Sequence, residues 1–360
     1  MNVNILMGTL VYGSVLALLS LGITLIYMTT KVFNFAHPRL SLFGAYLAIT
    51  AMAAYITGKG IQPDLTVHEG IIPYRLAYPA SVYIIGAVVA IVGGIIAAMV
   101  EYYLILKPLL DRGSDYLQLM IATLAYDFIL MAVLFLYNTH VKIVSLLNKI
   151  NVQSTSVDFS SYDLYIMKGY LTIPGDALYS TLIVLIITAA IYILLFKTTL
   201  GVKMRASIEN PPLAEVLGIN VRRIYALSWI ISGATAGLAG FFIMMRPSVA
   251  GLKPISATSP ADEIVVSAFA GSIVGGVNSI FGSLAGGMLI GFIEVYVTFF
   301  IGIATGLGAI TKYSRVISMF AVGLFLLFAP QGLAGLYKKY LAPPPAAPEL
   351  GEEEHEEGEG

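Results

Sequence analysis

The chain has 360 residues, of which 58% are hydrophobic and only 11% are charged, and its formal net charge is −1. Soluble domains carry about 25% charged residues, so this composition excludes an ordinary soluble protein and indicates an integral membrane protein with one large spanning domain. The absence of cysteine excludes disulfides, cysteine-ligated metals and thiol catalysis, and the four histidines are scattered without a metal-ligand spacing.

Long apolar runs follow one another along the chain. A membrane-spanning helix needs roughly 20 such residues, and most of these runs are about that long. Helices and closed barrels are the only structures that span a bilayer, and these runs are far longer than barrel strands. We therefore expect an all-α, polytopic transmembrane helical bundle of eight or nine segments, the seventh of which is short enough to be re-entrant or broken. The candidate spans are 5–30, 40–57, 80–106, 117–137, 178–196, 223–245, 263–276, 281–302 and 315–330.

The N-terminal run has no basic residues before it and is too long for a signal-peptide core, so it is expected to be a retained span. Polar residues crowd the junction after it, in the sequence NFAHPR. Pro38 and its polar neighbours predict a tight turn whose side chains cap helix ends. His37 has no visible partner that would make it a ligand or a pH switch.

Three acidic residues fall inside predicted spans, where charges are rare. Glu101 lies close enough to Lys107, near the end of its span, for snorkelling or pairing to account for it. Asp127 lies deeper, about 15 Å from the end of its helix at 1.5 Å per residue. For Asp127 and the central Glu294, a structural hydrogen bond and a place on a transport pathway are both compatible with the sequence.

Two loops stand out between the spans. Residues 138–177 are rich in Ser, Asp and Tyr and are expected to form an ordered external excursion. Residues 197–223 carry five of the 20 basic residues and contain a short predicted helix, which Asn210 can cap and Gly218 can end. Basic loops favour the cytoplasmic side. With this loop inside, alternation of the spans places the N-terminus outside and the C-terminus in the cytoplasm.

The domain organisation follows from these assignments. Residues 1–340 form one transmembrane domain, and residues 341–360 form a Pro-rich and Glu-rich cytoplasmic tail that is expected to be disordered. Seven of the 21 acidic residues lie in that tail, so the membrane domain itself is mildly basic. Glycine-rich stretches at 232–240 and 271–291 suit close helix packing, and they also permit breaks or hinges.

No catalytic motif is visible, including the metalloprotease, esterase and phosphate-loop patterns. The chain is therefore expected to be neither an enzyme nor a cofactor-binding or nucleic-acid-binding protein. If transport through it uses ATP, another subunit supplies the hydrolysis.

Five blocks of the chain, in order, resemble the permease subunits of branched-chain amino-acid ABC transporters, in the branch whose pattern includes NFAHG. The first two are GITLIYMTTKVFNFAHPRLSLFGAYLA and, at 100–130, VEYYLILKPLLDRGSDYLQLMIATLAYDFIL. The others are the polar loop, VVSAFAGSIVGGVNSIFGSLAGGMLIGFIEV at 265–295 and APQGLAGL at 329–336. Together they cover most of residues 15–340.

The chain departs from that pattern at several positions. Pro38 stands where the family has Gly, Ser267 where Lys is common, and Asn278 where Gly is common. Tyr126 and Asp127 replace small or polar residues of the pattern, whereas Glu101 and Glu294 match its acidic residues. The departures within membrane segments bear on which solute is carried more than on family membership.

The resemblance implies the permease subunit of an ATP-driven importer in a prokaryotic inner membrane. Its implied partners are two ATPase subunits, a second homologous permease and an extracytoplasmic solute-binding protein, and its implied solutes are branched-chain or related amino acids carried by alternating access. The implied ATPase-docking residues are Arg205, Glu209, Ala214, Leu217 and Gly218. A secondary transporter or channel that works without ATPase subunits is the alternative.

Six residues are candidates for the translocation path, because they are polar and lie in segments that are expected at membrane depth. They are Asn34, Thr123, Asp127, Ser267, Asn278 and Glu294.

Overall fold

The structure is a computed structural model that describes residues 3–61, 64–66, 75–77, 79–141, 164–166, 171–173, 175–245, 259–306, 313–329 and 331–340. Its α-helices are α1 (Val3–Thr30), α2 (His37–Lys59), α3 (Ala80–Glu101), α4 (Lys107–Asp111), α5 (Tyr116–Val141), α7 (Gly175–Lys197), α8 (Thr199–Glu209), α9 (Pro211–Val216), α10 (Val221–Met245), α11 (Ser259–Gly275), α12 (Ile280–Phe292), α13 (Thr298–Thr305), α14 (Ser314–Phe328) and α15 (Gly332–Tyr340). Two π-helical segments, η1 (Tyr102–Leu106) and η3 (Ile293–Val297), continue α3 and α12.

The predicted helical bundle is confirmed. Eight helical segments of the described residues are long and apolar enough to cross a membrane, and the seventh predicted span is a shorter apolar helix, Ile264–Gly275. Outside the bundle lie two small antiparallel hairpins, which pair β1 (Asp64–Thr66) with β2 (Arg75–Ala77) and β3 (Leu164–Ile166) with β4 (Leu171–Ile173). Of the predicted external loop at 138–177, the structure describes the second hairpin and the adjoining ends of α5 and α7; the rest of that loop, and the predicted tail, lie outside the described residues.

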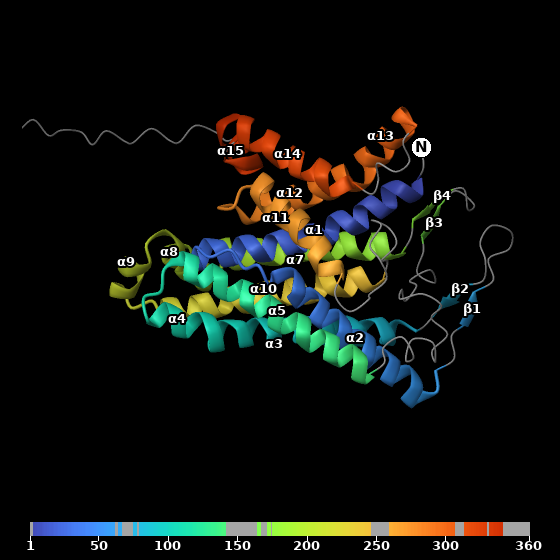
Figure 1. The fold of residues 1–360 in the computed structure, drawn as a ribbon, viewed down its shortest axis with the longest axis horizontal. Helices are drawn as coiled ribbons and strands as arrows, with labels where there is room; N and C mark the ends of the chain where they lie inside the picture. Colours follow the sequence, from blue (N-terminus) through green and yellow to red (C-terminus); the bar gives the residue numbers. More distant parts are fainter. Residues whose placement is uncertain are drawn as a thin grey trace, which may run out of the picture.

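The centre of the bundle is formed by α1 and α10, which are enclosed by the other helices (Figure 1). The spanning part of α1 is 94% buried and that of α10 is 78% buried, whereas α5, α7 and α14 expose most of their apolar side chains. In lipid there is little hydrophobic force between helices, so the inner helices must be held by close van der Waals packing and hydrogen bonds.

Small residues provide that packing at two helix contacts. α1 lies against α12, where Gly13 meets Gly291, and α10 lies against α3, where Gly233 meets Gly94. A methyl group on any of these four glycines would press against the backbone or the side chains of the facing helix, three of them against its backbone. The side-chain-free surfaces therefore allow the two helix pairs to approach closely.

The two packing sites belong to an internal repeat. Residues 93–103 and 286–296 share two glycines, six further residues, a glutamate, one residue and a tyrosine. The helices α2 and α3 pack together, as do α11 and α12, while α1 packs on the second unit and α10 on the first. α1 precedes the first unit in the chain and α10 precedes the second, so each of these two helices packs on the other's unit. We call this the exchange of first helices. α1 and α10 run in opposite directions (Figure 1).

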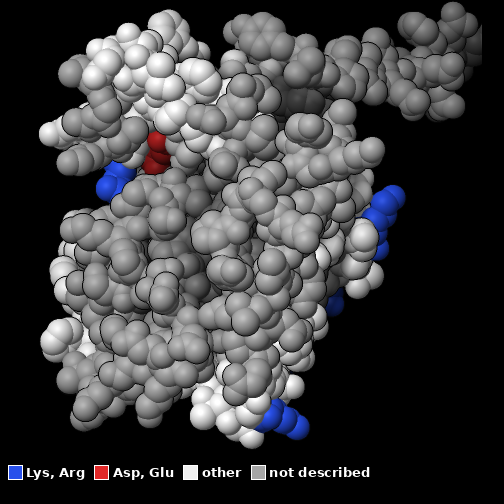
Figure 2. Space-filling model, turned by 90° about the vertical axis from the view of Figure 1, so that its right-hand side faces the viewer, with Lys and Arg blue, Asp and Glu red and all other residues white. Residues whose placement is uncertain are grey.

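The two ends of the bundle differ in what they carry. α8, α9 and the chain's last described helix α15 lie toward one end, and the N-terminus and the strands lie toward the other (Figure 1). Figure 2 looks onto the second of these ends, where the charged side chains of described residues are scattered rather than clustered. The basic loop predicted at 197–223 therefore lies at the end opposite the N-terminus.

Candidate functional site

The loop at 197–223 folds into two short helices, α8 and α9, instead of the single helix that the sequence suggested. The Thr198 hydroxyl accepts a hydrogen bond from the Gly201 N–H (3.1 Å), and the Asn210 side chain accepts one from the Leu213 N–H (3.1 Å). Gly218 has a φ of +79°, a left-handed conformation that favours glycine after a helix. The predicted cap at Asn210 and the predicted end at Gly218 are confirmed.

The surface of α9 is apolar and exposed. Leu213 is 54% exposed, Val216 84% and Leu217 69%. Ala214 is buried at 1% exposure, so the expectation that its small side chain meets a partner is wrong; it packs against its own chain. The side chain of Leu217 is exposed, which a contact with a partner would require.

The two charged residues proposed for the same surface lie on α8. The Arg205 guanidinium carbon lies 5.2 Å from the centroid of the Phe196 ring, so its charge stacks on a ring of its own chain. The side chain of Glu209 is exposed at the end of α8.

The start of α10, which follows α9 in the chain, is joined to the helix that carries Glu101. The Tyr102 hydroxyl donates to the Arg222 carbonyl oxygen (3.0 Å), and the Arg222 guanidinium pairs with Asp111 (3.0 Å). A hollow of about 220 Å³ lies beside these contacts and is lined by Pro211 and Glu215 among others. The exposed ion pair adds little stability, but the two contacts link the start of α10 to η1 and α4.

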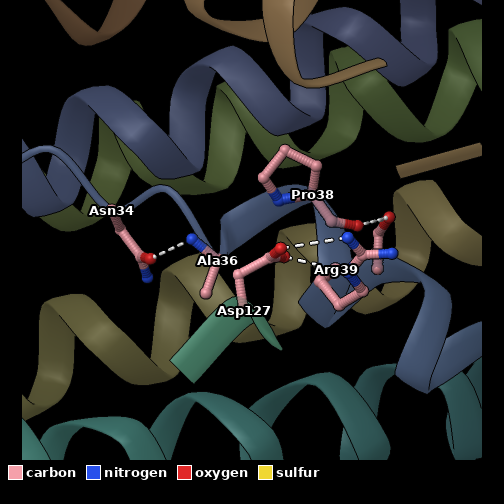
Figure 3. Close-up of polar contacts among 6 residues, drawn as sticks. Asn34, Ala36, Pro38, Arg39 and Asp127 are labelled. Carbon is pink, nitrogen blue, oxygen red and sulfur yellow. Dashed lines mark hydrogen bonds and ion pairs between the residues drawn. The ribbon is translucent and has the colours of Figure 1, made fainter. Parts of the chain in front are cut away.

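The junction 34–39 is almost entirely buried and lies between several helices (Figure 3). The Asn34 side chain accepts from the Ala36 N–H (2.8 Å) and donates to Glu101 Oε2 (2.9 Å). The N-cap residue of α2 is Ala36, which makes no capping hydrogen bond through its own side chain, so Asn34 is the residue of the junction that satisfies a backbone N–H at the start of α2. The side chains of Asn34 and Arg39 also bridge to neighbouring helices.

Two residues of α5 accept hydrogen bonds from this junction. The Thr123 hydroxyl accepts from the Phe35 N–H (3.2 Å). Asp127 accepts two hydrogen bonds from Arg39, at 2.9 Å from Nε and 3.0 Å from Nη2 (Figure 3). This is the bidentate geometry in which Arg–carboxylate pairs are strongest. Asp127 thus forms an ion pair with a basic residue of α2.

His37 is fully buried and contributes to packing. Its ring lies against Gly22, where a methyl group would collide with it, and its Nδ1 lies 3.2 Å from the Ser232 hydroxyl. The interpretation of His37 as a structural residue is consistent with these contacts.

The second half of the bundle has its own buried polar group. Glu294 accepts from the Tyr12 hydroxyl at Oε2 (2.8 Å) and from the Ser267 hydroxyl at Oε1 (2.6 Å). The structure therefore brings two predicted path residues together and adds Tyr12 to them. Asn278 lies apart: it is exposed in the turn between α11 and α12, beside a groove of about 360 Å³ against α14 and α15, and not within a spanning helix as the sequence suggested.

Sequence reasoning missed Arg39 as the partner of Asp127 and Tyr12 as a partner of Glu294. The signal that was available is the repeated motif with two glycines and a glutamate, which marks Glu101 and Glu294 as equivalent. The partners come from helices far away in the sequence, and no local pattern connects them. Within the described ranges, no group of three or more His, Asp or Glu is placed to hold a metal ion.

Comparison with known proteins places this bundle in a family. The family model "Branched-chain amino acid transport system / permease component" matches residues 5–329. A probable branched-chain amino acid transport permease protein LivH of Methanocaldococcus jannaschii is 36% identical over 94% of each chain. The high-affinity permease proteins LivH of Escherichia coli K12 and BraD of Pseudomonas aeruginosa are 26% and 24% identical, over 90% and 92% of this chain and 92% and 94% of their own.

No solved structure matches the chain. The family match covers far more than half of the sequence, and the LivH relative is similar over nearly its whole length. The chain therefore belongs to the family of permease components of branched-chain amino acid transport systems.

Proposed function

We propose that this chain forms half of a translocation path that imports branched-chain or related hydrophobic amino acids, with energy from separate ATPase subunits. The partners in this proposal are two ATPases, a second homologous permease and an extracytoplasmic binding protein. Relatives along the whole chain are named as branched-chain amino acid permeases, which supports the solute class. The absence of any phosphate-binding motif supports an external source of ATP hydrolysis.

The observation that carries the proposal is the exposed apolar face of α9. Three large apolar side chains stand out from a capped helix at the end of the bundle, where an unpartnered protein surface would be expected to be polar. An ATPase seated on Leu213, Val216 and Leu217 would cover them. Motion of α9 would then be passed to α10, which contacts α9, and through the bond between Arg222 and Tyr102 to η1 and the adjoining buried Glu101.

The docking proposal is tested by co-purification of the ATPase with tagged permease. We expect Val216→Asp and Leu217→Asp each to release the ATPase, because a charge on the covered surface would have to be buried without a partner. The matched control is Ile303→Asp, at an exposed apolar residue of α13 near the opposite end of the bundle (61% exposed). Retention of ATPase by both α9 variants would overturn the docking assignment.

The solute and the energy source are tested together in proteoliposomes that contain the assembled transporter and the loaded binding protein. We expect ATP-dependent uptake of leucine, isoleucine and valine, and no uptake with a non-hydrolysable ATP analogue. Uptake that persists without ATPase subunits would favour the secondary transporter or channel instead.

Orientation is also part of the proposal, with the N-terminus outside, and α9 and the C-terminus in the cytoplasm of a prokaryotic cell. The chain has no cysteine, so single-cysteine variants report position without background. We expect a cysteine at Leu217 to be protected from an impermeant reagent in intact cells and a cysteine at Gly58 to be labelled.

A further inference from the structure

The ion pair between Arg39 and Asp127 lies at the depth of the membrane. Asp127 is 11 residues into α5 from Tyr116, which places it about 16 Å along a helix that rises 1.5 Å per residue. The Arg39 side chain is 1% exposed, and that of Asp127 is 14% exposed. The carboxylate is therefore reachable from one side, while the guanidinium is held behind it.

The scaffold itself does not require charges at this place. Gly44 of α2 lies against Gly93, and in the second half Gly271 of α11 lies against Gly286, so Gly44 and Gly271 are equivalent in the repeat. Arg39 lies five residues before the first, and its counterpart five residues before the second is Val266. An apolar residue thus serves in the same packing position.

Stability is a weak reason to keep the pair. Replacing a buried ion pair with packed apolar residues is often neutral or stabilising. Ionisable residues inside a membrane are expensive, and those that are retained usually mark a path for a solute or an ion. The pair is consequently a candidate for recognition of a charged solute.

An aromatic cluster lies one helical turn from Asp127. Thr123 precedes Asp127 by four residues on α5, so the two side chains share a face, and the Thr123 hydroxyl holds the backbone of Phe35. The Phe35 ring lies 5.3 Å from that of Phe269, and Phe33 packs on Phe269 at 5.7 Å. All three rings are partly exposed, so the cluster offers an apolar surface beside the charges.

We propose that Arg39 and Asp127 form a transient binding site for the two charged groups of a free, apolar α-amino acid. The Arg39 guanidinium would bind the carboxylate in the fork geometry that it now offers to Asp127, and Asp127 would bind the ammonium group. The solute's side chain would lie on Phe35 and Phe269. One ion pair is exchanged for two, so no buried charge is left without a partner.

This inference rests on the proposed import of amino acids, and it makes a further claim about which solutes fit. An amide lacks the carboxylate that Arg39 needs, and a carboxylic acid without the amine lacks the group that Asp127 needs. In either case one member of the opened ion pair exchanges a charged partner for none from the solute, which should weaken binding of the analogue at least tenfold. The site should therefore discriminate strongly for zwitterions.

The test uses the assembled transporter in nanodiscs, without binding protein, and measures the thermal unfolding midpoint with leucine, leucinamide or 4-methylpentanoate at millimolar concentration. We expect leucine to raise the midpoint and the two analogues to have at least tenfold weaker effects. In the double variant Arg39→Gln, Asp127→Asn the leucine effect should disappear. Val266→Gln, at the equivalent place in the second half, is the control and should keep it.

A second variant guards against misfolding of the double variant. Arg39→Lys keeps the charge but loses the fork, and we expect it to weaken leucine binding at least tenfold. Equal responses of the unchanged transporter to leucine and both analogues would overturn the inference, as would a leucine response that survives in both variants. If the unchanged transporter takes up no amino acid or retains no ATPase, the proposed function fails instead.

Discussion

The first and second halves of the bundle share one packing scheme and differ in the polar groups that they enclose. In the first half, Glu101 has one hydrogen-bonded oxygen, from Asn34, and its other oxygen has no partner among the described residues. In the second half, both oxygens of Glu294 accept hydrogen bonds from hydroxyl groups. Both glutamates adjoin or lie in a π-helical segment, a feature frequent at functional sites.

The difference separates what the scaffold needs from what this chain adds to it. Glycines at the helix contacts and a buried glutamate occur in both halves, so they belong to the repeated unit. The Arg39–Asp127 ion pair occurs in the first half. In the second half, the position equivalent to Arg39 is occupied by Val266. Solute recognition is therefore best sought in the first half.

The largest expected difference between the halves comes from removing one member of the ion pair. Arg39→Met should lower the free energy of unfolding by about 3 kcal/mol, because Asp127 is left as an unpaired charge in the membrane. Val266→Met should change it by less than about 1.5 kcal/mol, as expected for one apolar residue replacing another. Denaturant unfolding of the purified chain in detergent measures both. Equal losses would show that the pair does not distinguish the halves.

A methyl group at the equivalent glycines should destabilise both halves alike. Gly94→Ala places a Cβ against the Gly233 carbonyl, and Gly287→Ala places one against the backbone at Ala17. Overpacking of this kind costs about 1–3 kcal/mol. Gly58→Ala is the control, since nothing lies near that position. Unfolding curves for the three variants test the repeat directly, and a loss in one half alone would break the equivalence.

The smallest expected effect concerns the two glutamates. Glu294→Gln should lose about 1–2 kcal/mol, because an amide nitrogen cannot accept the hydrogen bond from Tyr12 or Ser267. Glu101→Gln can still accept from Asn34 through its remaining oxygen and should lose less than about 1 kcal/mol. Thermal unfolding midpoints of the two variants check this order. The reverse order would mean that Glu101 is the more constrained of the two.

Much of the fold was predictable because long apolar runs and helix caps are local signals. The spans follow from the apolar composition of the runs. The start of α9 at Asn210 and its end before Gly218 follow from single residues with special backbone roles. The exchange of α1 and α10 was not predictable from such signals, since it depends on contacts between residues far apart in the chain, such as Gly13 with Gly291 and Gly94 with Gly233.

The candidate site was predictable only in part, for the same reason. Depth in a span marked Asp127 and Glu294, but their partners Arg39 and Tyr12 come from distant helices. Burial of Ala214 depends on which way a six-residue helix turns, and one turn of apolar residues does not determine that. Asn278 was misplaced because the short helix α11 ends before the turn that carries it.

The exchange of first helices also has a consequence for biosynthesis. α1 is made first, yet the helix that covers its glycine face is completed only at Phe292. At 5–20 residues per second, α1 waits roughly 15–50 s in the bilayer before that partner leaves the ribosome. During this interval its small residues face lipid or a chaperone of the insertion machinery. A chain truncated after α7 would hold the first helix but lack α10 and α12, the helices that pack most extensively on it, so completion of the C-terminal half controls when the N-terminal half becomes stable.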